Sequence, residues 1–264
     1  MRKLIQCVQN ENKETTIIET IHAIKNAGFD GVFVQWYDKD FEISQQAQVD
    51  LCRELGLEIE FAHLGYGNIN SLWYEEEQGD LEIENYIQNL RDMKKNNIDK
   101  VVMHLMNGKN FPPLSEIGLK RIRKVVDVAE ELGIKIAFEN TRSYEFLEYV
   151  FKNIESENIG ICLDTGHYHC HFKDKFNWDF FKDKIIALHI HDNFGEIDQH
   201  LLPFDGSLDW NDVSQKIMDS GYDGPVTLES CYRRKYLDIS VDEFYKNSYE
   251  TAKKVRELFD SKKN

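Results

Sequence analysis

The sequence predicts an α/β fold, a single (β/α)8 TIM barrel in which residues 1–264 form one domain. Eight short apolar, β-branched runs recur along the chain, and each is followed by a longer stretch with helical periodicity. Several of these stretches end at a glycine just before the next run, where a left-handed helix cap is expected. The length of 264 residues also fits a barrel of about 250 residues.

The eight apolar runs are the expected strands. They cover residues 4–9, 31–36, 57–64, 100–106, 135–140, 159–164, 185–192 and 225–230. The clearest helices are expected at 14–27, 44–55, 81–95, 115–132 and 241–259, and the capping glycines are Gly28, Gly56, Gly133 and Gly221. A doubly wound sheet is the alternative, but its phosphate-binding G-x-G-x-x-G pattern does not follow the first strand. The barrel is therefore favoured.

Composition limits the classes of function. The chain has 32 basic and 47 acidic residues, a net charge of −15, which weighs against nucleic acid as a partner because phosphate binding depends on clustered Lys and Arg. No apolar run reaches membrane-helix length and no signal peptide is evident, so a cytoplasmic protein is expected. The sequence leaves open whether the chain forms a homo-oligomer. The odd number of cysteines, five, without a C-x-x-C pair predicts reduced thiols.

Polar side chains collect where the expected strands end. His63 and His104 end the third and fourth strands, His167 follows the sixth, and His189 and His200 end or follow the seventh. Glu139, Asp164 and Glu229 each end an apolar strand. A barrel gathers its catalytic groups at this edge whatever the reaction. His169, His171 and His191 are expected behind these groups or at the surface.

Four of these side chains predict a divalent metal site. Glu139, Asp164, His189 and Glu229 come from the fifth to eighth strands, and buried carboxylates and imidazoles need a partner or a cation. This set suits Zn²⁺, Mn²⁺, Co²⁺ or Mg²⁺. One carboxylate alone is more typical of a helix cap or an ion pair, and two of the histidines, at positions 63 and 104, could be core residues bonded to backbone.

At these residues the sequence resembles the xylose isomerase-like TIM barrel superfamily, which includes metal-dependent sugar isomerases and epimerases and the endonuclease IV type of DNA repair enzyme. The matching segments are residues 138–141, 163–167, 188–193, 198–203 and 228–229. The resemblance implies that Glu139, Asp164, His189 and Glu229 hold one metal, that the two glutamates exchange protons with a sugar, and that His167 contacts it. Proton transfer beside a carbonyl through a metal-stabilised enediolate follows from these roles. The arginine that some epimerases carry six residues after the metal histidine is replaced by Gly195.

The same resemblance implies an alternative, a multinuclear zinc phosphodiesterase of the endonuclease IV type acting on abasic DNA. Its nine ligand positions are matched by His63, His104, Glu139, Asp164, His167, His189, Asp198, His200 and Glu229. The acidic net charge, the absence of that family's Ala-Gly-Gln-Gly run after Thr141, and a short acidic loop at 36–40 oppose it. A barrel that only binds a metal or a sugar is a third interpretation.

For an isomerase or epimerase of a small sugar, sugar phosphate or polyol, the remaining residues receive binding roles. His63, His104 and His167 are candidates for contacting the substrate. Trp36 could form an apolar wall under a sugar ring or belong to the core. Arg233 could bind a phosphate, since barrels often bind phosphate near the seventh and eighth strands.

Overall fold

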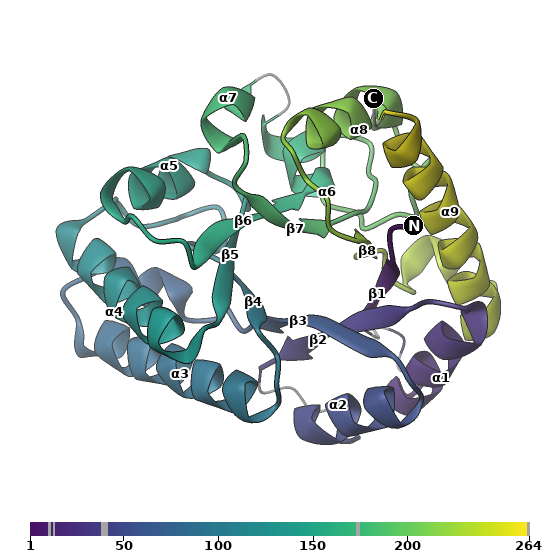
Figure 1. Cartoon of the computed structure of the whole chain (residues 1–264), viewed down its shortest axis with the longest axis horizontal. Helices are drawn as coiled ribbons and strands as arrows, with labels where there is room; N and C mark the ends of the chain where they lie inside the picture. Colours follow the sequence, from purple (N-terminus) through teal and green to yellow (C-terminus); the bar gives the residue numbers. More distant parts are fainter. Residues whose placement is uncertain (10–11, 13, 38–41, 173–174, 263–264) are drawn as a thin grey trace.

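Eight parallel strands surround a common axis in the computed structural model, and helices cover their outer side (Figure 1). The structure describes residues 1–9, 12, 14–37, 42–172 and 175–262, so part of the expected acidic loop, 38–41, lies outside the described residues. The strands are β1 (Leu4–Val8), β2 (Gly31–Trp36), β3 (Glu58–Leu64), β4 (Lys100–Met103), β5 (Lys135–Glu139), β6 (Ile159–Asp164), β7 (Ile185–His189) and β8 (Val226–Leu228).

The strand order confirms the predicted barrel. Neighbours run β7-β6-β5-β4-β3-β2-β1-β8, and the ring closes just beyond β7, where Ile190 forms a parallel bridge with Leu228. Each expected strand is present, although several are shorter than the apolar runs. β4 ends at Met103, so His104 lies one residue beyond it.

Helices follow the strands where the periodicity indicates. They are α1 (Ile17–Ala27), α2 (Gln45–Glu54), α3 (Glu77–Lys95), α4 (Glu116–Leu132), α5 (Tyr144–Asn153), α6 (Thr165–His167), α7 (Trp178–Phe181), α8 (Trp210–Asp219) and α9 (Val241–Ser261). α3 begins four residues earlier than expected, with Glu77 and Asp80 in its first turn, where acidic groups favour the helix dipole. Gly28 and Gly133 cap α1 and α4 in the left-handed conformation, with φ of 104° and 66°.

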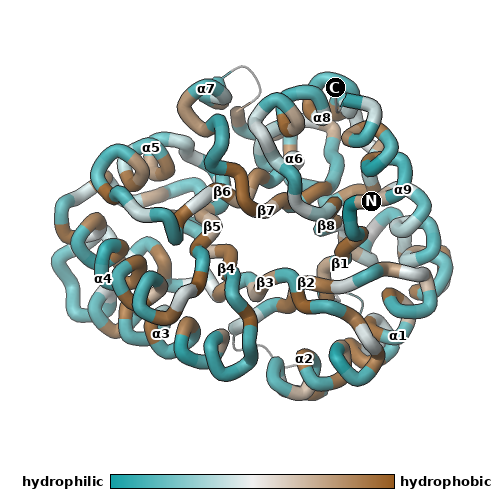
Figure 2. Tube along the Cα trace, in the orientation of Figure 1, coloured by the Kyte–Doolittle hydropathy of each residue, from teal (hydrophilic) through white to brown (hydrophobic). Residues whose placement is uncertain are grey.

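The apolar residues form two layers, because side chains on a strand alternate between its faces. The larger layer lies between the strands and the helices, and Figure 2 shows apolar strands inside helices of mixed character. The smaller layer fills the barrel interior with Cys7, Phe33, Phe61, Val102, Ala137, Cys162 and Ala187. This inner layer consists of the side chains that face the barrel axis, and it forms the floor beneath the strand ends.

Two further expectations concern the chain as a whole. The five cysteines form no disulfide with one another, and four of them are buried. Within the described ranges, no helix combines the length and the apolar character needed to span a bilayer.

Candidate metal centre

A cavity of about 480 Å³ opens at the carboxyl ends of the strands. The predicted site residues that line it are His63, His104, Glu139, His167, Asp198, His200, Glu229 and Arg233. Asp164 and His189 lie beneath them and are fully buried. The cavity therefore has a ring of ionisable groups above an apolar floor, as the positions of these residues at strand ends predict.

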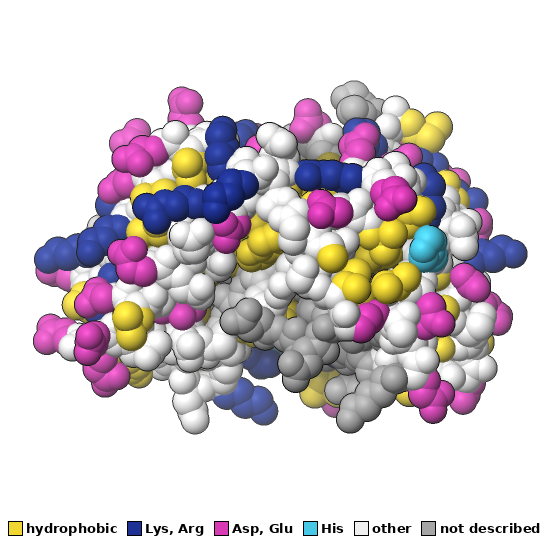
Figure 3. All heavy atoms as spheres, turned by 90° about the horizontal axis from the view of Figure 1, so that it is seen from below, with side chains coloured by type: hydrophobic (Ala, Val, Ile, Leu, Met, Phe, Trp, Pro, Cys, Tyr) yellow, Lys and Arg dark blue, Asp and Glu magenta, His cyan; other side chains and the backbone are white. Residues whose placement is uncertain are grey.

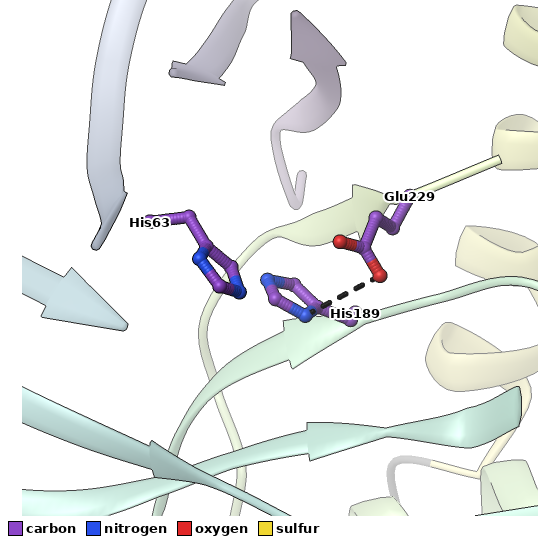
Figure 4. A group of neighbouring side chains, drawn as sticks. All are labelled: His63, His189 and Glu229. Carbon is purple, nitrogen blue, oxygen red and sulfur yellow. Dashed lines mark ion pairs between the residues drawn. The ribbon is translucent and has the colours of Figure 1, made fainter. Parts of the chain in front are cut away.

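His189 lies at the centre of the four residues predicted to bind one metal. Its Nδ1 is 3.3 Å from Glu139 Oε2, 3.5 Å from Glu229 Oε2 and 3.8 Å from Asp164 Oδ2. Figure 4 shows the ring of His189 between the ring of His63 and the carboxylate of Glu229. The structure thus brings together the four side chains that the sequence analysis places at the ends of four different strands.

The floor fixes the orientation of this central imidazole. The ring of His189 stacks on Phe33 with the centroids 5.0 Å apart, and Phe33 stacks on Phe61 at 4.7 Å. Since all three side chains are buried, the apolar layer keeps water from the lower side of the site. Neither ring nitrogen of His189 has a hydrogen-bond partner among the described residues.

The loop after β6 aims the carboxylate of Asp164. Asn140 joins β5 to β6 by accepting a hydrogen bond from the Asp164 amide at 2.6 Å and donating one to its carbonyl at 3.0 Å. Asp164 Oδ1 accepts from the His167 amide at 2.6 Å and so caps α6. Its second oxygen is left to face the histidines.

His63 and His104 form a second group with the same glutamate. Their Nε2 atoms are 3.2 and 3.1 Å from Glu139 Oε2. His63 Nδ1 lies 3.0 Å from the carbonyl of Leu64, and because a carbonyl only accepts, this nitrogen donates and Nε2 is the atom turned toward Glu139. Two residues expected either as ligands or as core histidines therefore point into the cavity.

A third group lies on the other side of the cavity. Asp198 Oδ2 is 2.8 Å from His200 Nε2 and 3.5 Å from His167 Nε2. His167 Nδ1 is 2.9 Å from Glu139 Oε1, so this histidine links the third group to the central one. The structure thus gathers all nine positions that the resemblance assigns to a multinuclear site.

His191, expected behind the ligands or at the surface, is fully buried against Asp164. Its Nε2 is 3.0 Å from Asp164 Oδ2, and its ring stacks on His200 with the centroids 4.0 Å apart. The signal for this position was present in the sequence, because residues two apart on an extended segment share a face, and His191 follows His189 by two.

Of the two remaining candidates for substrate binding, Arg233 lies at the cavity and Trp36 does not. Arg233 lines the cavity, as does Arg142, which the sequence analysis left without a role. Trp36 packs against the outer apolar layer, whereas the preceding residue, Gln35, lines the cavity. Strand alternation explains this difference, because only one of two consecutive side chains can face the barrel interior. Of the two roles left open for Trp36, its position fits core packing and not a wall under a sugar ring.

The donor set fits a divalent metal. Buried atoms without a hydrogen-bond partner among the described residues include both nitrogens of His189, Nδ1 of His104 and His191, and Oδ1 of Asp198. Such atoms cost about 1–3 kcal/mol each unless something satisfies them. Groups of three His, Asp and Glu ligand atoms, each within 4.8 Å of one another, occur around Glu139, Asp164, Asp198 and Glu229. Nitrogen and carboxylate ligands of this kind suit zinc, manganese or cobalt.

The two glutamates have opposite pKa shifts. Burial would raise the pKa of Glu139, but His104 and His189 hold it well below its usual range. Burial raises the pKa of Glu229 well above its usual range, and Asp164 and Glu139 add to the effect although His200 opposes it. Burial would also raise the pKa of Asp164, but His167 and His191 lower it to about 2. Without a cation, Glu139 is therefore ionised while Glu229 holds its proton.

The comparison with known families fits this geometry. A family model described as a xylose isomerase-like TIM barrel matches residues 21–259. The chain belongs to this family. Its relatives include an uncharacterised protein of Sinorhizobium fredii, y4fM, 32% identical over 149 residues, 56% of this chain and 47% of that protein. A probable endonuclease 4 of Mycoplasmopsis pulmonis is 24% identical over 183 residues, 60% of this chain and 66% of that protein.

Solved structures resemble nearly the whole chain. A D-tagatose 3-epimerase-like protein has a TM-score of 0.77 and 22% identity over 98% of this chain and 99% of its own. The IolI protein with a binding zinc atom has a TM-score of 0.74 and 18% identity over 98% of both chains. At these identities the likeness shows the fold. The chain spans about half the length of the first curated relatives it matches.

Proposed function

We propose that this chain is a divalent-metal-dependent isomerase or epimerase of a small sugar, sugar phosphate or polyol. The observation that carries the proposal is the convergence of two glutamates, one ending β5 and one directly after β8, on one buried imidazole. Glu139 and Glu229 lie 3.3 and 3.5 Å from His189 Nδ1. Two carboxylates beside one substrate position can exchange protons with neighbouring carbons or with both faces of one carbon. The epimerase-like structural neighbour supports the same reaction class.

Glu139, Asp164, His189 and Glu229 would hold the metal. When bound, Zn²⁺, Mn²⁺, Co²⁺ or Mg²⁺ would stabilise negative charge on substrate oxygens beside the carbon that loses its proton. The zinc atom of the IolI protein supports a divalent ion in this fold.

The residues of the chain would divide the proton transfer between them. One glutamate would take the proton from the carbon next to a carbonyl, and the other would return a proton to the opposite face, which inverts the centre. Return of the proton to the neighbouring carbon would move the carbonyl instead. His63, His104 and His167 line the cavity and would bind substrate hydroxyls. Arg233 lines the same cavity and would bind the phosphate of a phosphorylated sugar.

The test is proton exchange in deuterated water, followed by NMR for a panel of ketoses, aldoses, polyols and sugar phosphates. Glu139→Gln and Glu229→Gln should each lower the exchange rate by about 10²–10⁴-fold, the usual contribution of a positioned acid or base. Glu75→Gln, an exposed glutamate, is the matched control and should retain the wild-type rate. Full exchange in either active-site variant would contradict the two-glutamate mechanism.

A zinc phosphodiesterase acting on abasic DNA is the second candidate. Two groups, His63 with His104 and Asp198 with His200, flank the central site, and a clustered set of cations can activate water for phosphodiester cleavage. The probable endonuclease 4 relative favours this candidate. The net charge of −15 opposes it. On the side of the barrel shown in Figure 3, acidic and basic side chains are interspersed. Salt-sensitive cleavage of an abasic duplex by the zinc-loaded chain, without sugar exchange, would decide for it.

A further inference from the structure

We infer that Arg142 and Asn107 form a binding position for an anionic group, so that the substrate is a sugar acid or a sugar phosphate and not a neutral sugar or polyol. The inference rests on the proposed function for the reaction, and it deepens that function by naming the substrate class. The chemistry that the two residues recognise is an oxyanion, a carboxylate or a phosphate, attached to a small sugar.

The guanidinium of Arg142 faces the cavity without a partner from the chain. Arg142 lines the cavity together with two carboxylates, those of Glu139 and Asp198. Its side chain is exposed, and in the described ranges no hydrogen bond or ion pair joins its guanidinium to the protein. A guanidinium has five N–H donors in a fixed planar fork, which match the oxygens of a carboxylate or a phosphate. Its donors and its charge are therefore open to a ligand.

The arginines that hold the fold together have a different environment. Arg2 and Arg121 are both buried, and they donate to backbone carbonyls, Arg2 to Tyr222 at 3.0 Å and Arg121 to Leu72 at 3.1 Å. An unpaired arginine on the outer surface of a protein is ordinary, because water solvates it. Arg142 differs from both kinds, since it lines the cavity beside the metal centre and pairs with neither carboxylate there.

The residues on both sides of Arg142 are fixed by packing and hydrogen bonds. Thr141 and Ser143 are buried. The Thr141 hydroxyl donates to Met106 Sδ at 3.0 Å, and the Ser143 hydroxyl donates to Glu145 Oε2 at 2.6 Å. The chain therefore holds the backbone of Arg142 in place while its side chain extends into the cavity, so a bound anion has a defined position beside the end of β5.

The loop after β4 brings a second donor to the same part of the rim. The contact between Thr141 and Met106 joins this loop to the loop of Arg142, and Asn107 directly follows Met106. Asn70 accepts from the Asn107 amide at 2.8 Å and donates to the Asn107 carbonyl at 2.8 Å. Asn107 also lines the cavity, and its carboxamide has no hydrogen-bond partner among the residues described. This carboxamide can donate to an oxygen of the anion that Arg142 binds.

The position of Arg142 orients the substrate. Arg142 and Glu139 follow the same strand end and line the same cavity of about 480 Å³. An anionic group held by Arg142 therefore places the neighbouring carbons of a small substrate beside Glu139, one of the two glutamates proposed to exchange protons. This arrangement selects the carbons nearest the anionic group for the reaction.

Arg233 is the competing cation for the anionic group. It lies after β8, and β6 and β7 separate β8 from β5 in the ring (Figure 1). The two arginines therefore define separate positions, and an experiment can distinguish them.

The test compares three ligands with one hexose skeleton, glucose 6-phosphate, glucuronate and glucose. Their dissociation constants are measured by calorimetry on the metal-loaded full chain. Wild type should bind at least one of the anions about 10- to 100-fold more tightly than glucose, the range expected for hydrogen bonds to a charged group. Arg142→Gln should lose this preference, and Arg142→Lys should keep part of it. Arg91→Gln, which removes an exposed arginine of α3, is the matched control and should equal wild type.

Asn107→Ala measures the second donor. It should weaken binding of the preferred anion less than Arg142→Gln does, because it removes a neutral donor and no charge. Wild-type affinity in this variant would overturn the role of Asn107.

Either anion can support the inference. Tighter binding of glucose 6-phosphate identifies a phosphate, and tighter binding of glucuronate identifies a carboxylate. Wild type that binds neither anion more tightly than glucose overturns the inference. An Arg142→Gln variant that keeps the preference also overturns it, because the metal or Arg233 then holds the anion.

Circular dichroism checks the fold of each variant. If Arg142→Gln does not fold, a crystal structure of wild type with the preferred anion decides, because an oxyanion bonded to Arg142 supports the inference and one bonded only to Arg233 or to the metal contradicts it. Proton exchange is measured separately. Its failure for every ligand, with the anion preference intact, would contradict the proposed function and leave the anion position standing.

Discussion

The two ends of the barrel both bury charged side chains, but only one end satisfies them. At the amino-terminal end Lys100 Nζ is 3.2 Å from Glu60 Oε1 and donates to the Ile186 carbonyl at 3.0 Å, and the Thr227 hydroxyl donates to Glu60 Oε2. At the carboxyl-terminal end, imidazole nitrogens of His104, His189 and His191 lack hydrogen-bond partners among the residues described. Buried polar groups that satisfy one another stabilise a fold, whereas buried groups left unsatisfied indicate a missing ligand.

This difference shows that a cavity alone does not mark a functional site. A cavity of about 370 Å³ also lies at the amino-terminal end, and Glu60 and Lys100 line it. Its charges neutralise each other, and in barrels this end contributes to stability rather than to catalysis. Buried ligand atoms without hydrogen-bond partners among the described residues therefore distinguish the carboxyl-terminal cavity.

Metal removal should have the largest effect on activity, and it should act only at the carboxyl-terminal end of the barrel. Exhaustive dialysis against a chelator is expected to lower the proton-exchange rate at least about 10²-fold, because charge stabilisation by a cation contributes several kcal/mol. Re-added metal at 100 times its Kd should stabilise the fold by about 2.7 kcal/mol. Exchange kinetics and thermal unfolding before and after reloading measure both effects. Undiminished exchange in protein shown to be metal-free would contradict the metal centre.

Lys100→Met tests the opposite end. It should lower the free energy of unfolding by about 3–5 kcal/mol, since it leaves the buried Glu60 carboxylate without its cation, while metal binding and exchange kinetics stay at wild-type values. The double variant Glu60→Gln/Lys100→Met should recover part of the loss, because the amide can still accept from Thr227. Urea unfolding measures the difference. A fall in exchange rate in the folded single variant would mean that the two ends are coupled.

Local patterns were enough to predict most of the fold. The strands and glycine caps depend on residues close in sequence, and the positions of Glu139, Asp164, His189 and Glu229 at strand ends placed them together. The alternation of side chains along a strand places His191 on the face of His189. Of the two roles left open for Trp36, its position fits core packing, because its strand neighbour Gln35 faces inward. The Glu60 network had no such signal, because it joins β3, β4 and β8 and the register of β2 with β3 shifts between Val32 and Val34.

The acid dependence of stability should also differ between the ends. Interactions with His167 and His191 hold the pKa of Asp164 at about 2 against its usual 3.8. In metal-stripped protein this carboxylate therefore contributes stability above pH 4 that is lost as the pH falls toward 2, about 2 kcal/mol in total. Burial raises the pKa of Glu60, so ionising this carboxyl costs stability, and the stability falls as the pH rises through that pKa.

The unfolding free energy of metal-stripped wild type and Asp164→Asn, measured between pH 6 and pH 2, separates these contributions. The variant should lose the part of the acid slope that comes from Asp164 while keeping the slope from other groups. An identical slope in both proteins would show that the histidines do not stabilise this carboxylate. Glu60→Gln is the matched variant at the other end.

Trp36→Phe should have the smallest effect, because this side chain packs against the outer layer and not against the cavity. A change between two aromatic residues at a half-buried position should cost about 1 kcal/mol or less of stability and leave the KM for the substrate unchanged. Tyr66→Ala is the contrasting variant, since Tyr66 lines the cavity and stacks on His104 at 4.0 Å, and its KM should rise. A higher KM for Trp36→Phe than for Tyr66→Ala would show that the substrate extends beyond this cavity to the outer face of β2.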